Sequence, residues 1–508
     1  MIAPCYYKLV LGPIKALDHF KSNAWQQSCW ALVFNFSLAL QGLNSFLAYP
    51  RTRIRTATRR AIHGLLKAPL FLQPVLFPSM YPLPIGKLEI DRKDFWLSPE
   101  ARRKHFAIFG KSGVGKTTLM RNMAMCDIYA GAGITVIDPH GSLIDELLES
   151  IPRWRTNDVI YFNPKDTERA LGMNVLESVR DEQRALIVSN VVSIFRKIWE
   201  ASWGPRLEDI LRNGLYALIE QPEPMSLIAF PKLLLNAKYR AKILTNVQNP
   251  IVREFFRGYE HDWKETYKQE AIAPVLNKIR AFLINPLLRD IIGQTRSSFD
   301  FRWMMDHGKI LLCDLSKGAL GEDISSLLGS LLVTKLSLSA LSREDMPESE
   351  RVQHFLYVDE VHNFTYGMDL PTILSEARKY RLSLVIATQT ISQLQERSID
   401  AVFGNCATIM SFRVSGDDAL RLEREFALML SARELQHLPD YKLYIRTLHA
   451  LENITGDSPT DPLRVRAFAP FTKDGTENDR GKVIRASLVR YTRPRAEIEA
   501  ALTKFLAA

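Results

Sequence analysis

Residues 105–120 read HFAIFGKSGVGKTTLM. The stretch opens with a short apolar run and continues into a loop of glycine and small residues. The loop leads into TTLMRNMAM, which we interpret as an amphipathic segment. This order predicts a buried strand, a tight loop and a helix. Within it, residues 110–117 match the pattern GxxxxGK[ST], which is typical of loops that bind phosphate groups.

The chemistry of such a loop follows from its backbone. Glycines allow successive N–H groups to surround phosphates, and the helix that follows adds a positive field at its N-terminus. We expect Lys116 to reach the β- and γ-phosphates of ATP and the Thr117 hydroxyl to ligate Mg²⁺. The predicted nucleotide-binding residues are Gly110, Lys111, Ser112, Gly113, Val114, Gly115, Lys116, Thr117 and Thr118.

A second signal lies in residues 355–360, FLYVDE, where an apolar run ends in two carboxylates. An apolar run ending in Asp-Glu is common by itself, but downstream of a phosphate-binding loop it is informative. In an open parallel sheet, ligands bind beyond the carboxyl ends of the strands. We therefore expect Asp359 to hold Mg²⁺, directly or through water, and Glu360 to act as general base toward the attacking water.

Two weaker signals follow along the chain. Residues 382–389, LSLVIATQ, predict a strand that ends in Gln389, which we expect to sense the γ-phosphate or to position water. Arg378 precedes that strand and is a candidate arginine finger for the nucleotide of a neighbouring subunit. The alternative for Arg378 is a solvated helix face of mixed charge. His140, at the end of the strand 134–138, has no metal-binding partner at a suitable spacing.

The chain contains seven short apolar runs, several of them flanked by helical patterns. Such an order predicts a parallel sheet that is covered on both faces. The runs span 105–110, 134–138, 159–162, 309–315, 354–360, 382–389 and 407–412.

One part of the chain interrupts this pattern. Between 176 and 300 the apolar residues recur at helical spacing, as in 185–199 and 207–219. We interpret this part as an all-helical domain inserted into an α/β core, which explains the long separation of Lys116 and Asp359. The predicted regions are 1–70 (membrane-proximal), 71–175 and 301–450 (nucleotide-binding domain), 176–300 (inserted domain) and 451–508 (basic tail and helix).

Composition limits the class of protein. The 508 residues carry a formal net charge of +10. This excess favours a polyanionic partner, either nucleic acid or an anionic membrane, although a soluble basic protein is an equal alternative. The five cysteines are scattered and lack CxxC spacing, which argues against a disulfide framework and a zinc site.

The N-terminal region contains a candidate membrane segment, residues 22–50. No charged residue lies between Lys21 and Arg51. The apolar part of the segment, residues 29–49, is long enough to span a bilayer, but three amide side chains weaken it. It could span the membrane, lie on its surface or pack as a buried helix. If it spans, the arginines that follow it place the rest of the chain in the cytoplasm.

Taken together, these motifs resemble the conjugative coupling proteins of type IV secretion, the TraG/TraD-like branch of the HerA/FtsK motor superfamily. The resemblance covers about residues 84 to 450 and rests on the order of the motifs. The segments that carry it are HFAIFGKSGVGKTTLM, TVIDPHGSLIDELL, SWGPRLEDILRNGLYALIE, KILLCDLSKGALGED, LYVDEVHNF, SEARKYRLSLVIATQ and FGNCATIMSFRV.

The resemblance implies a RecA-like P-loop NTPase core, interrupted by an all-helical domain and assembled as a hexameric ring through which ATP hydrolysis moves DNA. It gives Lys116 and Thr117 the Walker A roles, Asp359 and Glu360 the Walker B roles, and Arg378 a role in trans. It also implies a bacterial cytoplasmic location at the inner membrane and contacts with other secretion or relaxosome components.

Two departures from the family pattern keep alternatives open. The candidate anchor is weaker than the usual paired transmembrane helices, and the chain lacks a long acidic tail for docking a relaxosome partner. One alternative is a soluble HerA-type ATPase that processes DNA. The other is a secretion ATPase that moves protein and recognises cargo through residues 176–300.

Overall fold

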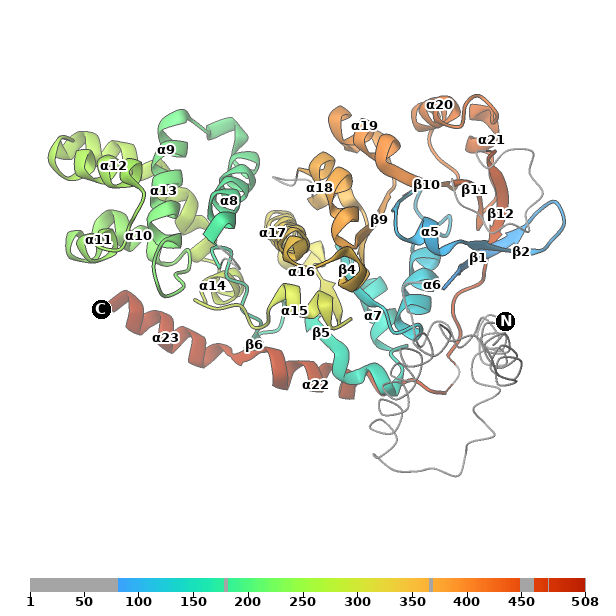
Figure 1. Cartoon of the computed structure of the whole chain (residues 1–508), viewed down its shortest axis with the longest axis horizontal. Coiled ribbons are helices and arrows are strands. Elements are labelled where there is room, and N and C mark those ends of the chain that lie inside the picture. Colours follow the sequence, from blue (N-terminus) through green and yellow to red (C-terminus); the bar gives the residue numbers. More distant parts are fainter. Residues whose placement is uncertain (1–80, 178–180, 365–368, 448–460, 474, 508) are drawn as a thin grey trace, which may run out of the picture.

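The computed structural model describes residues 81–177, 181–364, 369–447, 461–473 and 475–507. An eleven-stranded sheet forms its centre, in the order β2-β1-β12-β11-β10-β3-β9-β8-β4-β7-β5 (Figure 1). The seven strands from β10 to β5 are parallel to one another. They are β10 (Cys406–Ser411), β3 (His105–Phe109), β9 (Leu382–Thr388), β8 (His354–Val358), β4 (Gly133–Asp138), β7 (Ile310–Asp314) and β5 (Val159–Phe162).

These seven strands are the seven apolar runs predicted from the sequence, and the predicted α/β fold with a mostly parallel sheet is confirmed. Their continuous apolar character follows from burial on both faces. In β8, Phe355 and Tyr357 belong to the hydrophobic core on one face, whereas Leu356 and Val358 belong to the core on the other.

Different helices cover the two faces of the sheet. The core on one face contains side chains of α6 (Lys116–Tyr129), α7 (Ser142–Leu148) and α22 (Arg480–Tyr491). The core on the other contains side chains of α17 (Glu322–Leu341), α18 (Leu370–Glu376) and α19 (Glu396–Asn405). The expectation that α6 is amphipathic is wrong, because buried residues lie on nearly all its sides.

Four antiparallel strands extend the sheet beyond β10. The sequence analysis did not include any of them among the apolar runs. β12 alternates exposed and buried residues, and the central buried run of β11 is only three residues long, so neither strand forms a long continuous apolar run. The four are β11 (Lys442–Thr447), β12 (Leu463–Ala467), β1 (Leu83–Leu88) and β2 (Asp94–Leu97).

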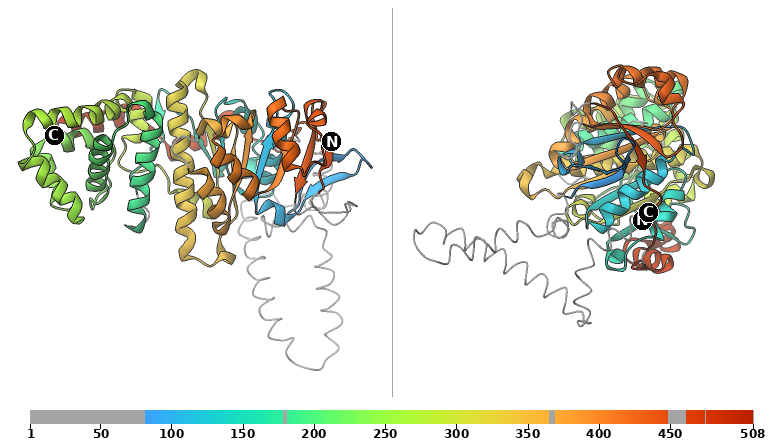
Figure 2. Two further views of the ribbon diagram at one scale, coloured as in Figure 1. Left: turned by 90° about the horizontal axis from the view of Figure 1, so that it is seen from above. Right: turned by 90° about the vertical axis from the view of Figure 1, so that its right-hand side faces the viewer.

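Helices are the only regular secondary structure in the described residues from Asp181 to Ile292. They gather at one end of the molecule, and the antiparallel strands lie at the other (Figure 2). The apolar face expected over residues 207–219 is buried in α9. The principal helices are α8 (Arg184–Ile198), α9 (Pro205–Ile219), α10 (Ala229–Leu235), α11 (Ala237–Leu244), α12 (Pro250–His261), α13 (Glu265–Leu283) and α14 (Pro286–Ile292).

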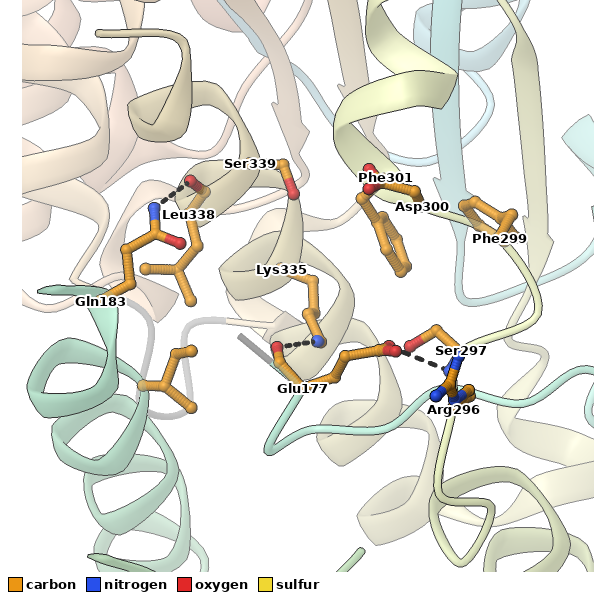
Figure 3. Close-up of a pocket in the computed structure, with 11 residues that line it drawn as sticks. Glu177, Gln183, Arg296, Ser297, Phe299, Asp300, Phe301, Lys335, Leu338 and Ser339 are labelled. Atoms are coloured by element: carbon orange, nitrogen blue, oxygen red, sulfur yellow. Dashed lines mark hydrogen bonds between the residues drawn. The ribbon is translucent and has the colours of Figure 1, made fainter. Parts of the chain in front are cut away.

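The two chain segments that connect these helices to the sheet meet at α17, around a cavity of about 300 Å³ (Figure 3). Lys335 of α17 donates to the carbonyl oxygen of Glu177 at 2.8 Å. The carboxylate of Glu177 in turn accepts from the backbone N–H of Ser297 at 2.9 Å. The segment that leaves the sheet at Glu177 and the segment that returns to it at Ser297 are therefore hydrogen-bonded to each other, and the first is also bonded to α17.

The C-terminal part of the chain joins both regions. The backbone N–H of Tyr161 in β5 donates to the Ser487 hydroxyl of α22 at 2.7 Å. The next helix, α23 (Arg495–Ala507), runs beneath the helical region (Figure 1). Its buried Arg495 donates to the carboxylate of Asp290 at 2.8 Å. A helix at the end of the chain was expected, whereas α22 and β12 were not.

One continuous helical stretch in the described part of the chain, Glu322–Asp345, is long and apolar enough to cross a membrane. In this structure 72% of its 18-residue apolar stretch is buried inside the fold. The candidate membrane segment 22–50, and with it the region 1–70, lies outside the described residues.

His354 gives the fold a predictable dependence on pH. Its Nε2 lies 2.9 Å from the Thr135 hydroxyl, and burial, followed by the charge of Arg343, lowers its pKa from 6.5 to about 3. Below pH 6.5 the unfolded chain binds a proton at His354 that the folded chain excludes. The free energy of unfolding therefore decreases as the pH is lowered. Between pH 6.5 and 5 we expect this group to contribute a loss of about 2 kcal/mol.

The measurement is denaturant unfolding at pH 7 and pH 5. The variant His354→Gln retains a hydrogen-bonding side chain without the titration, so its free energy of unfolding should fall less between these two values. Equal losses in the variant and the natural chain would contradict the expectation.

Candidate nucleotide-binding site

The loop after β3 is shaped by glycines at left-handed backbone angles. Gly113 has a φ of +79° and Gly115 a φ of +113°. A Cβ atom on Gly115 would lie 2.8 Å from the ring of Tyr441, so this close approach also requires glycine. The backbone N–H of Lys111 donates to the carbonyl oxygen of Arg413 at 2.8 Å, which fixes the loop to the chain beyond β10.

Lys116 is the first residue of α6, and its side chain is almost fully buried. Its amine donates to the carbonyl oxygens of Gly110 at 2.5 Å and Lys111 at 3.2 Å, and lies 3.7 Å from Oε1 of Glu360. Burial lowers the pKa of this amine, and the charges of Glu360 and Asp359 oppose that shift. The amine therefore lies at the loop that would receive phosphates.

Asp359 and Glu360 follow β8 directly. Oδ2 of Asp359 lies 3.5 Å from the Thr117 hydroxyl, which brings together the two oxygen ligands predicted for Mg²⁺. Burial, then the neighbouring carboxylates of Glu360 and Asp138, raises the pKa of Asp359 from 3.8 to about 6. Glu360 has a left-handed φ of +46°, a conformation that a non-glycine residue holds only where the surroundings enforce it.

The carboxylate of Glu360 is oriented by the end of β9. Its Oε2 accepts a hydrogen bond from the backbone N–H of Gln389 at 3.0 Å. Nδ1 of His362 lies 3.5 Å from the same oxygen and 3.2 Å from the Thr388 hydroxyl. The sequence analysis did not single out His362, because nothing in its spacing indicates that the turn after β8 brings it back to Glu360.

The side chains predicted to carry out the chemistry, apart from Arg378, line one pocket of about 400 Å³ at the carboxyl edge of the sheet. Gly110 and Val114, which were also predicted to bind nucleotide, belong to the loop but do not line the pocket, and Val114 is buried in the core. His140, Ser142 and Tyr441 line it without having been predicted to. The full lining is Lys111, Ser112, Gly113, Gly115, Lys116, Thr117, Thr118, His140, Ser142, Asp359, Glu360, Gln389 and Tyr441.

Arg378 lies away from this pocket. It precedes β9, so it sits at the amino edge of the parallel strands, whereas the nucleotide pocket is at the carboxyl edge. There the exposed Arg378 lines a separate pocket of about 570 Å³, together with Lys104 and Arg446. Within one chain, the structure does not bring Arg378 to the predicted catalytic residues.

A comparison with family models identifies the relatives of this chain. The model described as the type IV secretion-system coupling protein DNA-binding domain matches residues 95–439, which is more than half of the sequence. The chain belongs to this coupling-protein family. The resemblance seen in the motifs is thereby confirmed. Among curated proteins, no sequence matches the chain.

Solved structures of coupling proteins share the fold. The bacterial conjugative coupling protein TrwBdeltaN70, in its unbound monoclinic form, is 18% identical, with a TM-score of 0.51 over 75% of this chain and 88% of that one. Plasmid coupling protein TrwB in complex with a non-hydrolysable ATP analogue is 18% identical, with a TM-score of 0.51 over 78% and 97%.

VirB4 of Thermoanaerobacter pseudethanolicus has the same TM-score of 0.51, at 14% identity over 76% of this chain and 96% of that one. At these identities the likeness concerns the fold. The predicted RecA-like core, interrupted by helices, is confirmed for this member of the coupling-protein family.

Proposed function

We propose that this chain hydrolyses ATP and uses the free energy to move DNA, as a coupling protein of a type IV secretion system. The observation that carries the proposal is the meeting of Lys116, Thr117, Asp359 and Glu360 in one pocket. Family membership supports DNA as the partner, since the matching model describes a DNA-binding domain.

ATP with Mg²⁺ fits this pocket by the chemistry of the side chains. The Thr117 hydroxyl and the Asp359 carboxylate are hard oxygen ligands of the kind that Mg²⁺ prefers. When bound, Mg²⁺ neutralises charge on the β- and γ-phosphates. The pKa of Asp359 is raised by burial and by neighbouring negative charge, and a bound cation would offset both effects.

The roles of the chain's own groups follow from their positions. Lys116 exchanges its bonds to loop carbonyl oxygens for bonds to phosphate oxygens. Glu360 takes the proton of the attacking water on Oε1, because Oε2 already accepts from the backbone of Gln389. The side chain of Gln389 lines the same pocket, where it senses the γ-phosphate or positions the water.

The test is the ATPase rate of the full chain with and without single- and double-stranded DNA. We expect DNA to stimulate the rate. Lys116→Ala should lower kcat/KM about 100- to 1,000-fold by removing a charge stabiliser. Lys473→Ala changes a half-exposed lysine outside the pocket and is the matched control. An ATPase rate that is the same with and without DNA would contradict the proposal that the chain moves DNA. It would leave only the proposal that the chain hydrolyses ATP.

The larger assembly is part of the same proposal. Arg378 acts on the nucleotide of a neighbouring copy in a hexameric ring, which accords with its place at the sheet edge opposite the pocket. Residues 176–300 form the inserted domain between the two halves of the nucleotide-binding domain, 71–175 and 301–450. Residues 22–50 attach the ring to the inner membrane, on its cytoplasmic side, where secretion or relaxosome components make contact.

A mixing experiment tests Arg378. The variant Arg378→Ala keeps its loop but loses the arginine, and Lys116→Ala keeps the arginine but loses the loop. If each site combines a loop from one copy with an arginine from the next, a mixture should hydrolyse ATP although neither variant does so alone. No recovery in mixed assemblies, shown by co-purification to contain both chains, would contradict action in trans.

A further inference from the structure

Tyr441 occupies a defined place relative to the phosphate-binding loop. The strand order at this part of the sheet is β11-β10-β3-β9-β8 (Figure 1). The loop follows β3, and Glu360 follows β8, two strands to one side. Tyr441 directly precedes β11, two strands to the other side, and β11 runs antiparallel to β10, so Tyr441 also lies at the carboxyl edge.

This arrangement gives the pocket two ends. Lys116, Glu360 and Gln389 mark the end where the terminal phosphate must lie, because the hydrolytic groups gather there. A nucleotide extended along the loop from that end directs its nucleoside toward the opposite side. Tyr441 supplies an aromatic ring on that side of the pocket, whereas the phosphate end is lined by charged and amide groups.

The backbone holds Tyr441 in an uncommon conformation. Its φ is +62°, in the left-handed region. Its N–H donates to the carbonyl oxygen of Val114 in the loop at 2.9 Å, and its carbonyl oxygen accepts from the N–H of Ala467, the last residue of β12, at 2.9 Å. The ring lies against Gly115, so close that a Cβ atom there would be 2.8 Å from it.

Despite these restraints the side chain stays accessible, since Tyr441 is 46% exposed. A half-exposed aromatic ring gains little from burial, and a non-glycine residue in the left-handed region costs about 1–3 kcal/mol. Observed strain beside a binding site is a reason to look for function there. The two backbone hydrogen bonds need no tyrosine side chain, so the ring itself requires an explanation.

We propose that the ring of Tyr441 is the stacking surface for the nucleobase of the bound nucleotide. The inference rests on the proposed function, since it assigns the second end of the same pocket. A ring face attracts any nucleobase, because every base has a π-face. Tyr441 therefore adds affinity for nucleosides over bare phosphate chains without choosing strongly between adenine and guanine.

The test compares two ligands that share a phosphate chain, ADP and inorganic pyrophosphate, each with Mg²⁺, by titration calorimetry on the full chain. The main variant is Tyr441→Asn, because asparagine tolerates left-handed angles and the fold is kept. Tyr441→Gly is a second variant compatible with φ +62°, and Tyr441→Phe retains the ring. Lys116→Ala, which removes a phosphate contact, is the control that should weaken both ligands.

We expect Tyr441→Asn and Tyr441→Gly to weaken ADP roughly 5- to 100-fold, with pyrophosphate unchanged and Tyr441→Phe close to the natural chain. Equal weakening of both ligands would overturn the inference, because it would mean that the ring only shapes the loop. Unchanged ADP binding would overturn it as well. A natural chain that binds neither ligand would instead contradict the proposed function.

Discussion

Replacing Glu360 by glutamine is expected to stop ATP hydrolysis while leaving nucleotide binding intact. Glutamine has nearly the same shape, and its carbonyl oxygen can still accept the hydrogen bond that Gln389 donates to Oε2 at 3.0 Å. What it cannot do is take a proton from water at neutral pH. Loss of a general base costs about 100- to 10,000-fold in rate, so kcat should fall by that factor.

The measurement separates chemistry from binding. Single-turnover hydrolysis reports the chemical step, and calorimetry reports the dissociation constant for ADP, which should stay close to that of the natural chain. The matched control is Glu434→Gln, a carboxylate on the sheet's carboxyl side that caps a short helix outside the pocket. Near-normal hydrolysis by Glu360→Gln would mean that another group acts as the general base.

Much of this site could be predicted because each part is local in sequence. The loop pattern identifies Lys116 and Thr117, and an apolar strand ending in Asp-Glu identifies Asp359 and Glu360. Parallel strands then bring their carboxyl ends to one edge, so the separate motifs meet without any knowledge of side-chain contacts. The same rule places Arg378 at the opposite edge, because it precedes β9 whereas Gln389 follows it.

The rest depends on tertiary structure. Tyr441 reaches the pocket only because β11 pairs antiparallel with β10, and the short apolar run inside β11 does not stand out in the sequence. His362 returns to Glu360 through a left-handed turn at Glu360 itself. Asp127 lies in the last turn of an apolar helix, and no local pattern pairs it with Arg102, 25 residues earlier in the chain.

Asp127 is the centre of a buried polar cluster beneath the sheet. Its Oδ1 accepts hydrogen bonds from Arg102 and from the Tyr81 hydroxyl, and its Oδ2 accepts from the Tyr357 hydroxyl at 2.5 Å. All four residues are at most 4% exposed. The guanidinium of Arg102 also lies 4.0 Å from the ring centre of Phe355. The cluster joins α6, which begins at the phosphate-binding loop, to β8, which is followed directly by the two carboxylates proposed to act in hydrolysis.

Removing the charge of Asp127 should therefore destabilise the fold strongly. The variant Asp127→Asn leaves the Arg102 guanidinium buried without a counter-charge, and breaking a buried ion pair in this way costs about 3–5 kcal/mol. Glu146→Gln removes the half-exposed partner of Arg121 and is the matched control, with an expected cost of about 0–1 kcal/mol. Denaturant unfolding at pH 7 measures both losses.

A double variant separates the charge from the packing. If the unpaired guanidinium causes the loss, Arg102→Met combined with Asp127→Leu should be less destabilised than Asp127→Asn, because apolar side chains then replace both charges. The double variant also removes the acceptor of the Tyr81 and Tyr357 hydroxyls, so equal losses in the single and double variants would mean that these hydrogen bonds contribute as much as the charge. Since α6 and β8 carry the two halves of the nucleotide site, Asp127→Asn should also weaken ADP binding before the chain unfolds.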